Sequence, residues 1–368
     1  MELLNATRMQ AAYTMGMKAD GRELLVVAVK GTFGLPKSGE EEPVLADEQI
    51  ELVQADTFTG KPGFSAPVYE TDYAAEKPRC DVLLNGSAYA PGGRATKKVT
   101  VSLHVGPISK SFDVIGNRVW LSAIVGTVPS PPEPFTVMPI SYDRAFGGID
   151  ITHEDPAKHR FYEYNHAGVG FHQQTGREFV DGTPLPNTEE SGGPVNEPRG
   201  SYRPMAFGPI GRAWLPRVKL AGTYDQNWID NIFPFLPPDF DELYYQAAPP
   251  DQQMDYPRGG EEVVLVNLTP EGYTSFRLPS LNMPVVFYLK EEENKETQAV
   301  VDTIVIEPDL QRFTLTWRSF LPLRKNLFEV EQVLVGEMSA GWHRARELGK
   351  TYYPSLGALV AERNGSED

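Results

Sequence analysis

Only one cysteine, Cys80, occurs in the 368 residues, so no intrachain disulfide can form. This composition is typical of proteins that fold in a reducing compartment. No apolar run approaches the roughly 20 residues that a membrane-spanning helix needs, and the longest, such as residues 24–29, have the length of a strand. The first residues lack the basic segment and apolar core of a secretory signal. We therefore expect a soluble, cytoplasmic protein.

Basic residues are scarce relative to acidic ones. The chain has 34 Lys and Arg against 50 Asp and Glu, a formal net charge of −16, and Lys97-Lys98 is a pair rather than a cluster. Such a surface repels nucleic-acid phosphates and anionic lipids, so we expect neither nucleic acid nor membrane as a partner. The acidic excess keeps a protein soluble, which is its more common meaning. It would also favour a partner with a basic surface, and binding to such a partner should weaken as salt is added.

The sequence also lacks the common nucleophile and phosphate-binding motifs. Ser87 lies in Asn-Gly-Ser-Ala-Tyr, which has no closing glycine for a G-x-S-x-G turn. Residues 168–170 form a Gly-x-Gly fragment without a following helix pattern or lysine. The neighbours of Cys80 do not favour a nucleophile, and we expect a half-buried structural thiol. We predict no catalytic residue, no cofactor and no metal, and therefore no enzyme.

Four of the six histidines lie close together and leave one enzymatic alternative open. They are His153, His159, His166 and His172, at spacings of six, seven and six residues. None of these spacings gives the i, i+4 pair that places two metal ligands on one helix face. We favour loop residues, and a metal-assisted hydrolase that uses the loop 153–172 stays as an alternative.

Glycine, proline and aromatic residues are abundant by contrast. With 33 Gly, 32 Pro and an aromatic fraction of 11%, the chain combines many turns with side chains that can order long loops. Residues 24–33 are β-branched and apolar, as in a buried strand, and residues 98–105 alternate with period two. Further strands are expected at residues 81–89, 109–114, 117–121, 262–267, 273–278, 285–290, 302–307 and 312–318.

The fold class that follows is mainly β, with sandwich- or barrel-like sheets, long ordered loops rich in Pro, Gly and aromatics, and a few short helices. We divide the chain into a β-rich region 1–128, a loop-rich aromatic region 129–257 packed on the core, and a β-rich region 258–350 with a short terminal helix. Together they are expected to form one compact unit over about residues 5–350.

Two turns and one helix are predicted at specific places. Gly116-Asn117 and residues 309–311 have the composition of hairpin turns. Residues 329–347 are the best helix candidate, although Gly336 and Gly341 weaken it.

Mixed clusters of aromatic and polar residues are the strongest remaining feature. Residues 138–148 read Met-Pro-Ile-Ser-Tyr-Asp-Arg-Ala-Phe-Gly-Gly. We expect Arg144 to pair with a carboxylate, and Tyr142 and Phe146 to be packed. These clusters either lock the loops onto the core or form a rigid recognition surface, since Trp, Tyr and Arg dominate interface hot spots. The candidate residues from these clusters are Tyr142, Arg144, Phe146, Trp214, Tyr224, Asp225 and Trp228.

Several unusual strings, in the same order along the chain, resemble the domain-of-unknown-function family 2169 (DUF2169). They lie at residues 70–86, 88–93, 138–148, 185–187, 207–210, 221–225 and 237–241. The resemblance runs from about Asn5 to Arg318, and its first string adds Asp72 and Lys77 to the candidate residues. In one departure from the family pattern, His166 follows Asn165 where a proline is expected.

The resemblance implies a function without catalysis. Members of the family resemble adaptors or chaperones of the bacterial type VI secretion system, which help to load toxic effectors onto the VgrG spike. The implied partners are an effector, often with a PAAR or PAAR-like tip, and VgrG itself, in the bacterial cytoplasm. A structural subunit of the secretion particle is a further alternative, and a homodimer stays open.

Overall fold

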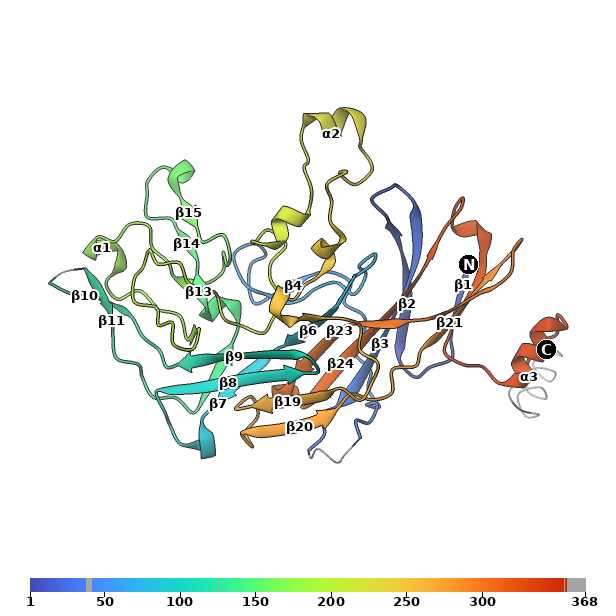
Figure 1. Ribbon diagram of the computed structural model, residues 1–368, viewed down its shortest axis with the longest axis horizontal. Helices are drawn as coiled ribbons and strands as arrows, with labels where there is room; N and C mark the ends of the chain where they lie inside the picture. Colours follow the sequence, from blue (N-terminus) through green and yellow to red (C-terminus); the bar gives the residue numbers. More distant parts are fainter. Residues whose placement is uncertain (38–41, 125, 354, 356–368) are drawn as a thin grey trace, which may run out of the picture.

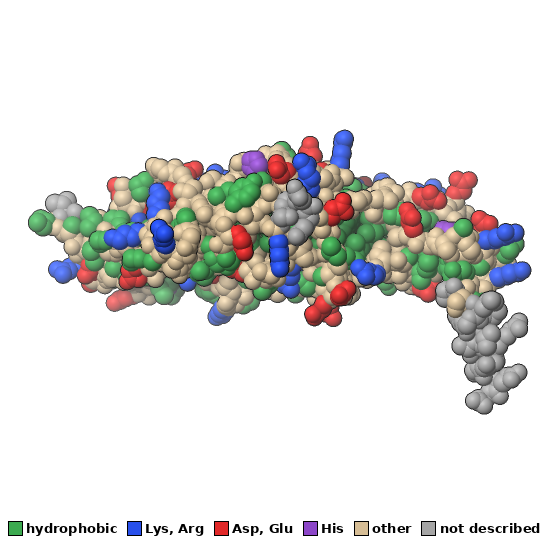
Figure 2. Space-filling model, turned by 90° about the horizontal axis from the view of Figure 1, so that it is seen from below, with side chains coloured by type: hydrophobic (Ala, Val, Ile, Leu, Met, Phe, Trp, Pro, Cys, Tyr) green, Lys and Arg blue, Asp and Glu red, His purple; other side chains and the backbone are tan. Residues whose placement is uncertain are grey.

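The computed structural model describes residues 1–37, 42–124, 126–353 and 355. It is mainly β with a few short helices, as the sequence predicts. The molecule is elongated and flattened, with the sheets lying along its length (Figure 1). On the face that Figure 2 shows, acidic and basic side chains are interspersed among apolar ones, so the net charge is not gathered into one acidic patch there.

A six-stranded sheet forms the centre of the fold. Its strand order is β18 (Gln253–Met254), β6 (Cys80–Leu84), β23 (Val300–Glu307), β24 (Arg312–Pro322), β3 (Glu23–Gly34) and β2 (Gln10–Met17). The ten inner residues of β3 are all buried, because both faces of the sheet are covered. Residues such as Val27 and Val29 face the main hydrophobic core, whereas the alternate residues, including Lys30, face the other side.

A five-stranded sheet packs against the same core. Its strand order is β17 (Thr188–Glu189), β9 (Ile108–Ile115), β8 (Lys98–Val105), β19 (Glu262–Val266) and β20 (Tyr273–Arg277). In β8 the inward residues Val99, Val101, Leu103 and Val105 are buried, which confirms the period-two prediction. Both large sheets take strands from all three regions of the sequence, so these regions share one core.

A four-stranded sheet brings the two ends of the chain together. Its strand order is β1 (Glu2–Asn5), β25 (Val330–Val335), β21 (Pro284–Leu289) and β22 (Lys295–Gln298), with β1 parallel to β25. The helix predicted over residues 329–347 is therefore wrong in its first half. Gly336 takes a positive φ of 81° after β25, and only α3 (Ala340–Glu347) is helical. The β-branched residues Val330, Val333 and Val335 favour the strand.

Two further predictions, one turn and one strand, are wrong, whereas a second predicted turn is confirmed. No hairpin forms at Gly116-Asn117, because β9 pairs with β8 and β17, and the strand after it, β10 (Trp120–Ser122), pairs with β11 (Thr127–Pro129). The predicted strand 81–89 breaks at Asn85 into β6 and β7 (Gly86–Tyr89), which belong to different sheets. The turn at 309–311 does join β23 to β24. Cys80 is fully buried in the core rather than half-buried.

The middle of the chain consists of short elements and long ordered segments. The remaining strand pairs are β12 (Val137–Ile140) with β7, β13 (Phe146–Gly147) with β16 (Val169–Gly170), β14 (Ile149–Asp150) with β15 (Arg160–Phe161), and β4 (Thr57–Phe58) with β5 (Pro67–Tyr69). The short helices here are α1 (Arg177–Val180) and α2 (Gln226–Asn231). The 3-10 turns of the chain are η1 (Pro91–Gly93), η2 (Tyr142–Arg144), η3 (Pro156–Lys158), η4 (Arg217–Leu220), η5 (Glu242–Tyr245), η6 (Pro250–Gln252), η7 (Pro308–Leu310) and η8 (Leu327–Glu329).

Two parts of this middle region project from the same side of the sheets (Figure 1). We call residues 149–166, which contain β14 and β15, the knob, and residues 222–239, which contain α2, the arm. Among the described residues, no helix is long and apolar enough to cross a membrane.

Candidate functional site

Asp72 and Lys77 belong to a buried ion-pair network on the outer face of the six-stranded sheet. Lys30 Nζ lies 2.8 Å from Asp72 Oδ2, and the same oxygen accepts the backbone N–H of Val53. Thr316 of β24 donates its hydroxyl to the other Asp72 oxygen at 3.2 Å. Asp72 thus ties an irregular segment to two strands, and neither partner of the pair is accessible.

Lys77 forms the second pair of this network. Its Nζ donates to Asp81 Oδ2 at 2.8 Å and to the Thr303 hydroxyl at 2.9 Å. Asp81 also accepts from Gln246 Nε2 and from the backbone N–H of Ala247, each at 2.7 Å. Burial lowers the pKa of Lys77, but the attraction of Asp81 and further carboxylates outweighs it and leaves the pKa raised. Buried charges persist only when paired in this way, so the network is structural.

Residues 138–148 are also structural. The Tyr142 ring packs edge-on against Trp214 with centroids 5.4 Å apart, and both side chains are buried. Arg144 does not pair with a carboxylate, contrary to expectation. Its Nη1 donates to Asn187 Oδ1 at 3.0 Å and contacts Met138 Sδ at 3.5 Å. The nearest acid in sequence, Asp143, instead accepts from the backbone N–H of Ala66 and the hydroxyl of Thr59.

Phe146 fixes the base of the knob. Its ring is 1% exposed and packs edge-on against Tyr162 and Tyr202, with centroids 5.0 and 4.9 Å away. The following Gly147 and Gly148 have φ of 153° and 110°, and a Cβ atom on Gly147 would lie 2.3 Å from the carbonyl oxygen of Asn165. Only glycine fits there. The packing of Tyr142 and Phe146 is therefore confirmed.

Asn165, which precedes the unexpected histidine, holds this turn together. Its buried amide donates to the carbonyl oxygens of Tyr142 and Phe146 at 2.8 and 3.1 Å. Its side-chain oxygen accepts the backbone N–H of Ala167. This hydrogen bond bridges position 166 and fixes the turn, so no proline is needed there.

The arm is closed at its base by one carboxylate. Asp239 accepts from the backbone N–H and the hydroxyl of Thr223, at 2.9 and 2.7 Å. Gly222 has a positive φ of 81° at the point where the chain enters the arm. At the tip, Asp225 caps α2 by accepting the backbone N–H of Trp228 at 2.8 Å. The arm is therefore an ordered loop.

Aromatic side chains fill and cover the arm. Trp228 donates its indole N–H to the carbonyl oxygen of Phe235 at 2.9 Å, and its ring lies between Tyr224 and Phe233, with centroids 4.7 and 5.5 Å away. A Cβ atom on Gly21 would lie 2.9 Å from the Phe235 ring, so this ring rests on the turn between β2 and β3. The exposed apolar residues of the arm are Tyr224 (52%), Ile229 (56%), Phe233 (67%) and Phe235 (46%).

The knob carries a second group of exposed apolar side chains, Ile151, Phe161 and Tyr164. Its inner contacts centre on Asp150, which accepts the backbone N–H groups of Gln173 and Gln174 at 2.7 and 2.9 Å. Burial raises the pKa of Asp150, but these hydrogen bonds and those from Thr152 outweigh it and leave the pKa lowered.

Two clefts are lined partly by the segment between the knob and the arm and partly by other segments. One, of about 180 Å³, is lined by Trp214, His166, and the charged residues Asp56, Glu70, Arg212 and Arg217. Arg217 is buried and donates to Glu70 at 2.5 Å, so the two acids and two arginines balance one another. The other, of about 400 Å³, is lined by Tyr142, Tyr164 and several prolines.

The four clustered histidines make separate local contacts. His159 bonds through a ring nitrogen to the carbonyl oxygen of His153 at 2.9 Å, and His172 bonds to the Thr183 hydroxyl at 3.0 Å. His166 packs between Phe161 and Trp214. In the described part of the chain, no group of three or more His, Cys, Asp or Glu is placed to hold a metal ion.

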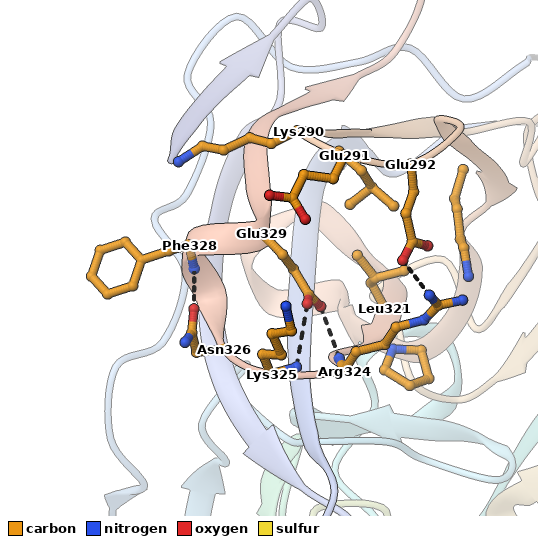
Figure 3. Close-up of a pocket in the computed structure, with 12 residues that line it drawn as sticks. Lys290, Glu291, Glu292, Leu321, Arg324, Lys325, Asn326, Phe328 and Glu329 are labelled. Carbon is orange, nitrogen blue, oxygen red and sulfur yellow. Dashed lines mark hydrogen bonds and ion pairs between the residues drawn. The ribbon is translucent and has the colours of Figure 1, made fainter.

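A further cleft, of about 450 Å³, lies at the far end of the molecule, beside the four-stranded sheet (Figure 3). Glu329 accepts the backbone N–H groups of Arg324 and Lys325, and Arg324 pairs with Glu292. Phe328 points away from the cleft in Figure 3 and is 78% exposed. These charged groups hold together the connection between β21 and β22 and the connection between β24 and β25.

The sequence model of a family described as "Uncharacterized protein conserved in bacteria (DUF2169)" matches residues 20–318. Because this is most of the chain, the protein belongs to that family. The match ends at Arg318, as the resemblance does, and begins later than Asn5. It includes the knob and the arm and leaves out β1, β2, β25 and α3. No curated protein and no solved structure matches the chain.

The candidate residues thus fall into two classes. Asp72, Lys77, Tyr142, Phe146 and Trp214 are buried, and the half-buried Arg144 belongs with them through its bond to Asn187. Tyr224, Asp225 and Trp228 lie together on the arm. Sequence reasoning missed the exposed residues Ile229 and Phe233, and the knob residues Ile151 and Phe161. The run of aromatics and prolines at 233–238 was visible. However, a short apolar run without periodicity does not reveal whether its side chains face core or solvent.

Proposed function

We propose that this protein is a non-enzymatic adaptor or chaperone of a bacterial type VI secretion system. It binds an effector with a PAAR or PAAR-like tip in the cytoplasm and helps to load it onto the VgrG spike. Membership of DUF2169 supports this proposal, because the family strings are those that resemble secretion adaptors.

The observation that carries the proposal is the arm. It exposes four large apolar side chains on a loop that projects from the sheets (Figure 1). Contiguous exposed apolar surface of this kind marks a site of protein interaction. Tyr224 and Phe233, two of these four residues, pack against Trp228. Aromatic residues of this kind dominate interface hot spots.

The arm is suited to this role because it is ordered before any partner arrives. The Asp239 closure, the Asp225 cap and the Trp228 indole bond fix its backbone from within. A preformed loop avoids much of the entropy cost of ordering a segment on binding. The knob adds apolar contacts on the same side, and the buried ion pairs hold the segments below in place.

The test first looks for effector and VgrG genes beside this one in the genome, and then attempts to co-purify the chain with their products. The proposal expects a stable complex of the purified chain with at least one of them, in the absence of any added cofactor. A protein that elutes alone in every mixture would sink the proposal. Recovery of the chain from the secreted fraction together with the spike would favour a structural subunit of the particle instead.

A further inference from the structure

The charge on the arm indicates which surface it binds. Resting on the proposed function, we infer that the arm inserts into an apolar groove on its partner protein, and that this groove is rimmed by Lys and Arg side chains.

The charged residues within segment 221–243, which contains the arm, are all acidic. Residues 221–243 contain no Lys or Arg, and their acids are Asp225, Asp230, Asp239, Asp241 and Glu242. These carboxylates cap helices or bond to neutral groups, as Asp230 does with the Gln226 amide at 2.9 Å. In the residues that the structure describes, none of the five lies in an ion pair with a basic side chain. The arm therefore keeps its negative charge available.

The knob differs from the arm in this respect. Lys158 precedes β15 and Arg160 begins it, close in sequence to Glu154 and Asp155, so both signs are present in the knob. A partner that carries positive charge is therefore attracted to the arm more strongly than to the knob, since complementary charge steers association.

The shape of the arm favours a groove over a flat surface. The arm projects from the molecule (Figure 1), and its exposed residues Tyr224, Ile229 and Phe233 come from both the helix and the segments flanking it. A convex element buries all of these side chains only in a concave partner, as when an apolar helix enters a groove. Asp225 and Asp230, which cap and belong to α2, are then close to the surface of the partner.

A second copy of this chain is a poor occupant by the same reasoning. Each copy carries a net charge of −16, so an arm approaching another copy meets like charge overall. We therefore commit to a different protein with a basic rim.

The experiment measures affinity for the purified neighbouring effector and VgrG at 50 and 500 mM NaCl by biolayer interferometry. Asp230→Lys should weaken binding about tenfold at low salt, with a smaller difference at high salt. Ile229→Ser with Phe233→Ser should weaken it more than about tenfold at both salts, because it removes apolar contact.

Matched controls lie at the far end of the molecule. Glu296→Lys makes the same charge change on the exposed strand β22, and Phe328→Ser removes a ring that is 78% exposed, against 67% for Phe233. Both should bind within about twofold of the wild type, and circular dichroism should show that all variants fold alike.

The results distinguish a failure of the proposed function from a failure of the inference about the arm. A wild-type chain that binds neither protein refutes the proposed function and this inference with it. Wild-type binding that all arm variants retain overturns the inference alone. Loss of binding in the apolar variant without any effect of Asp230→Lys at low salt also overturns it, because the rim would then carry no positive charge.

Discussion

Removing the Lys77 side-chain charge should destabilise the whole fold. Lys77→Met removes the ion-pair partner that lies 2.8 Å from Asp81, a fully buried carboxylate. Breaking a buried ion pair from one side costs about 3–5 kcal/mol. Asp81 keeps the hydrogen bonds from Gln246 and Ala247, so we expect the lower end, about 3 kcal/mol, or about a hundredfold in the unfolding equilibrium.

Urea unfolding followed by tryptophan fluorescence measures this loss. The midpoint should fall while the slope of free energy against urea stays unchanged, because the surface exposed on unfolding is the same. Lys18→Met is the control, since the Lys18–Glu76 pair at 3.0 Å is partly solvated and should contribute no more than about 1 kcal/mol.

A double variant completes the test. Lys77→Met with Asp81→Asn removes both charges and should recover part of the lost stability, because no unpaired charge is then buried. The reasoning is refuted if Lys77→Met unfolds at the wild-type midpoint, or if the double variant is no more stable than the single one.

Three further predictions concern residues with distinct environments. Phe146→Ala should lower stability by about 3–5 kcal/mol, whereas the exposed Phe161→Ala should change the melting temperature little; equal effects would contradict the packing described. Arg144→Ala should cost about 1–3 kcal/mol by leaving the buried Asn187 oxygen without its donor, measured by urea unfolding, and an unchanged midpoint would refute it. Burial lowers the pKa of Lys110 to about 8 from 10.5, so the unfolded chain binds more protons between these values and stability should rise with pH there. Lys110→Met should remove this part of the slope, and an unchanged pH profile would contradict the assignment.

Much of the sheet structure follows from local sequence patterns. The apolar run of β3 and the alternation of β8 depend only on which faces are buried, and both were predictable. The turn before Arg312 was equally clear, since Pro308 and Asp309 favour it. The break at Asn85 and the strand β25 were not, because both depend on which distant strand is available to pair.

The candidate site was less predictable, because a residue's role there depends on whether its side chain is buried or exposed. Arg144 finds its partner at Asn187, 43 residues away in sequence, and local sequence gives no sign of this pairing. The aromatic composition around Tyr224 and Trp228 pointed to a cluster, but the core and the surface use the same residues. Only the fold shows that these aromatics stand on a projecting arm while Tyr142 and Phe146 are buried.

Size-exclusion chromatography shows whether the arm holds the proposed partner. The purified chain and its Ile229→Ser, Phe233→Ser variant are each mixed with the effector and with VgrG and run on the column. We expect an earlier-eluting complex for the wild type and separate peaks for the variant. Co-elution of the folded variant to the same extent as the wild type would mean that the arm does not bind the partner.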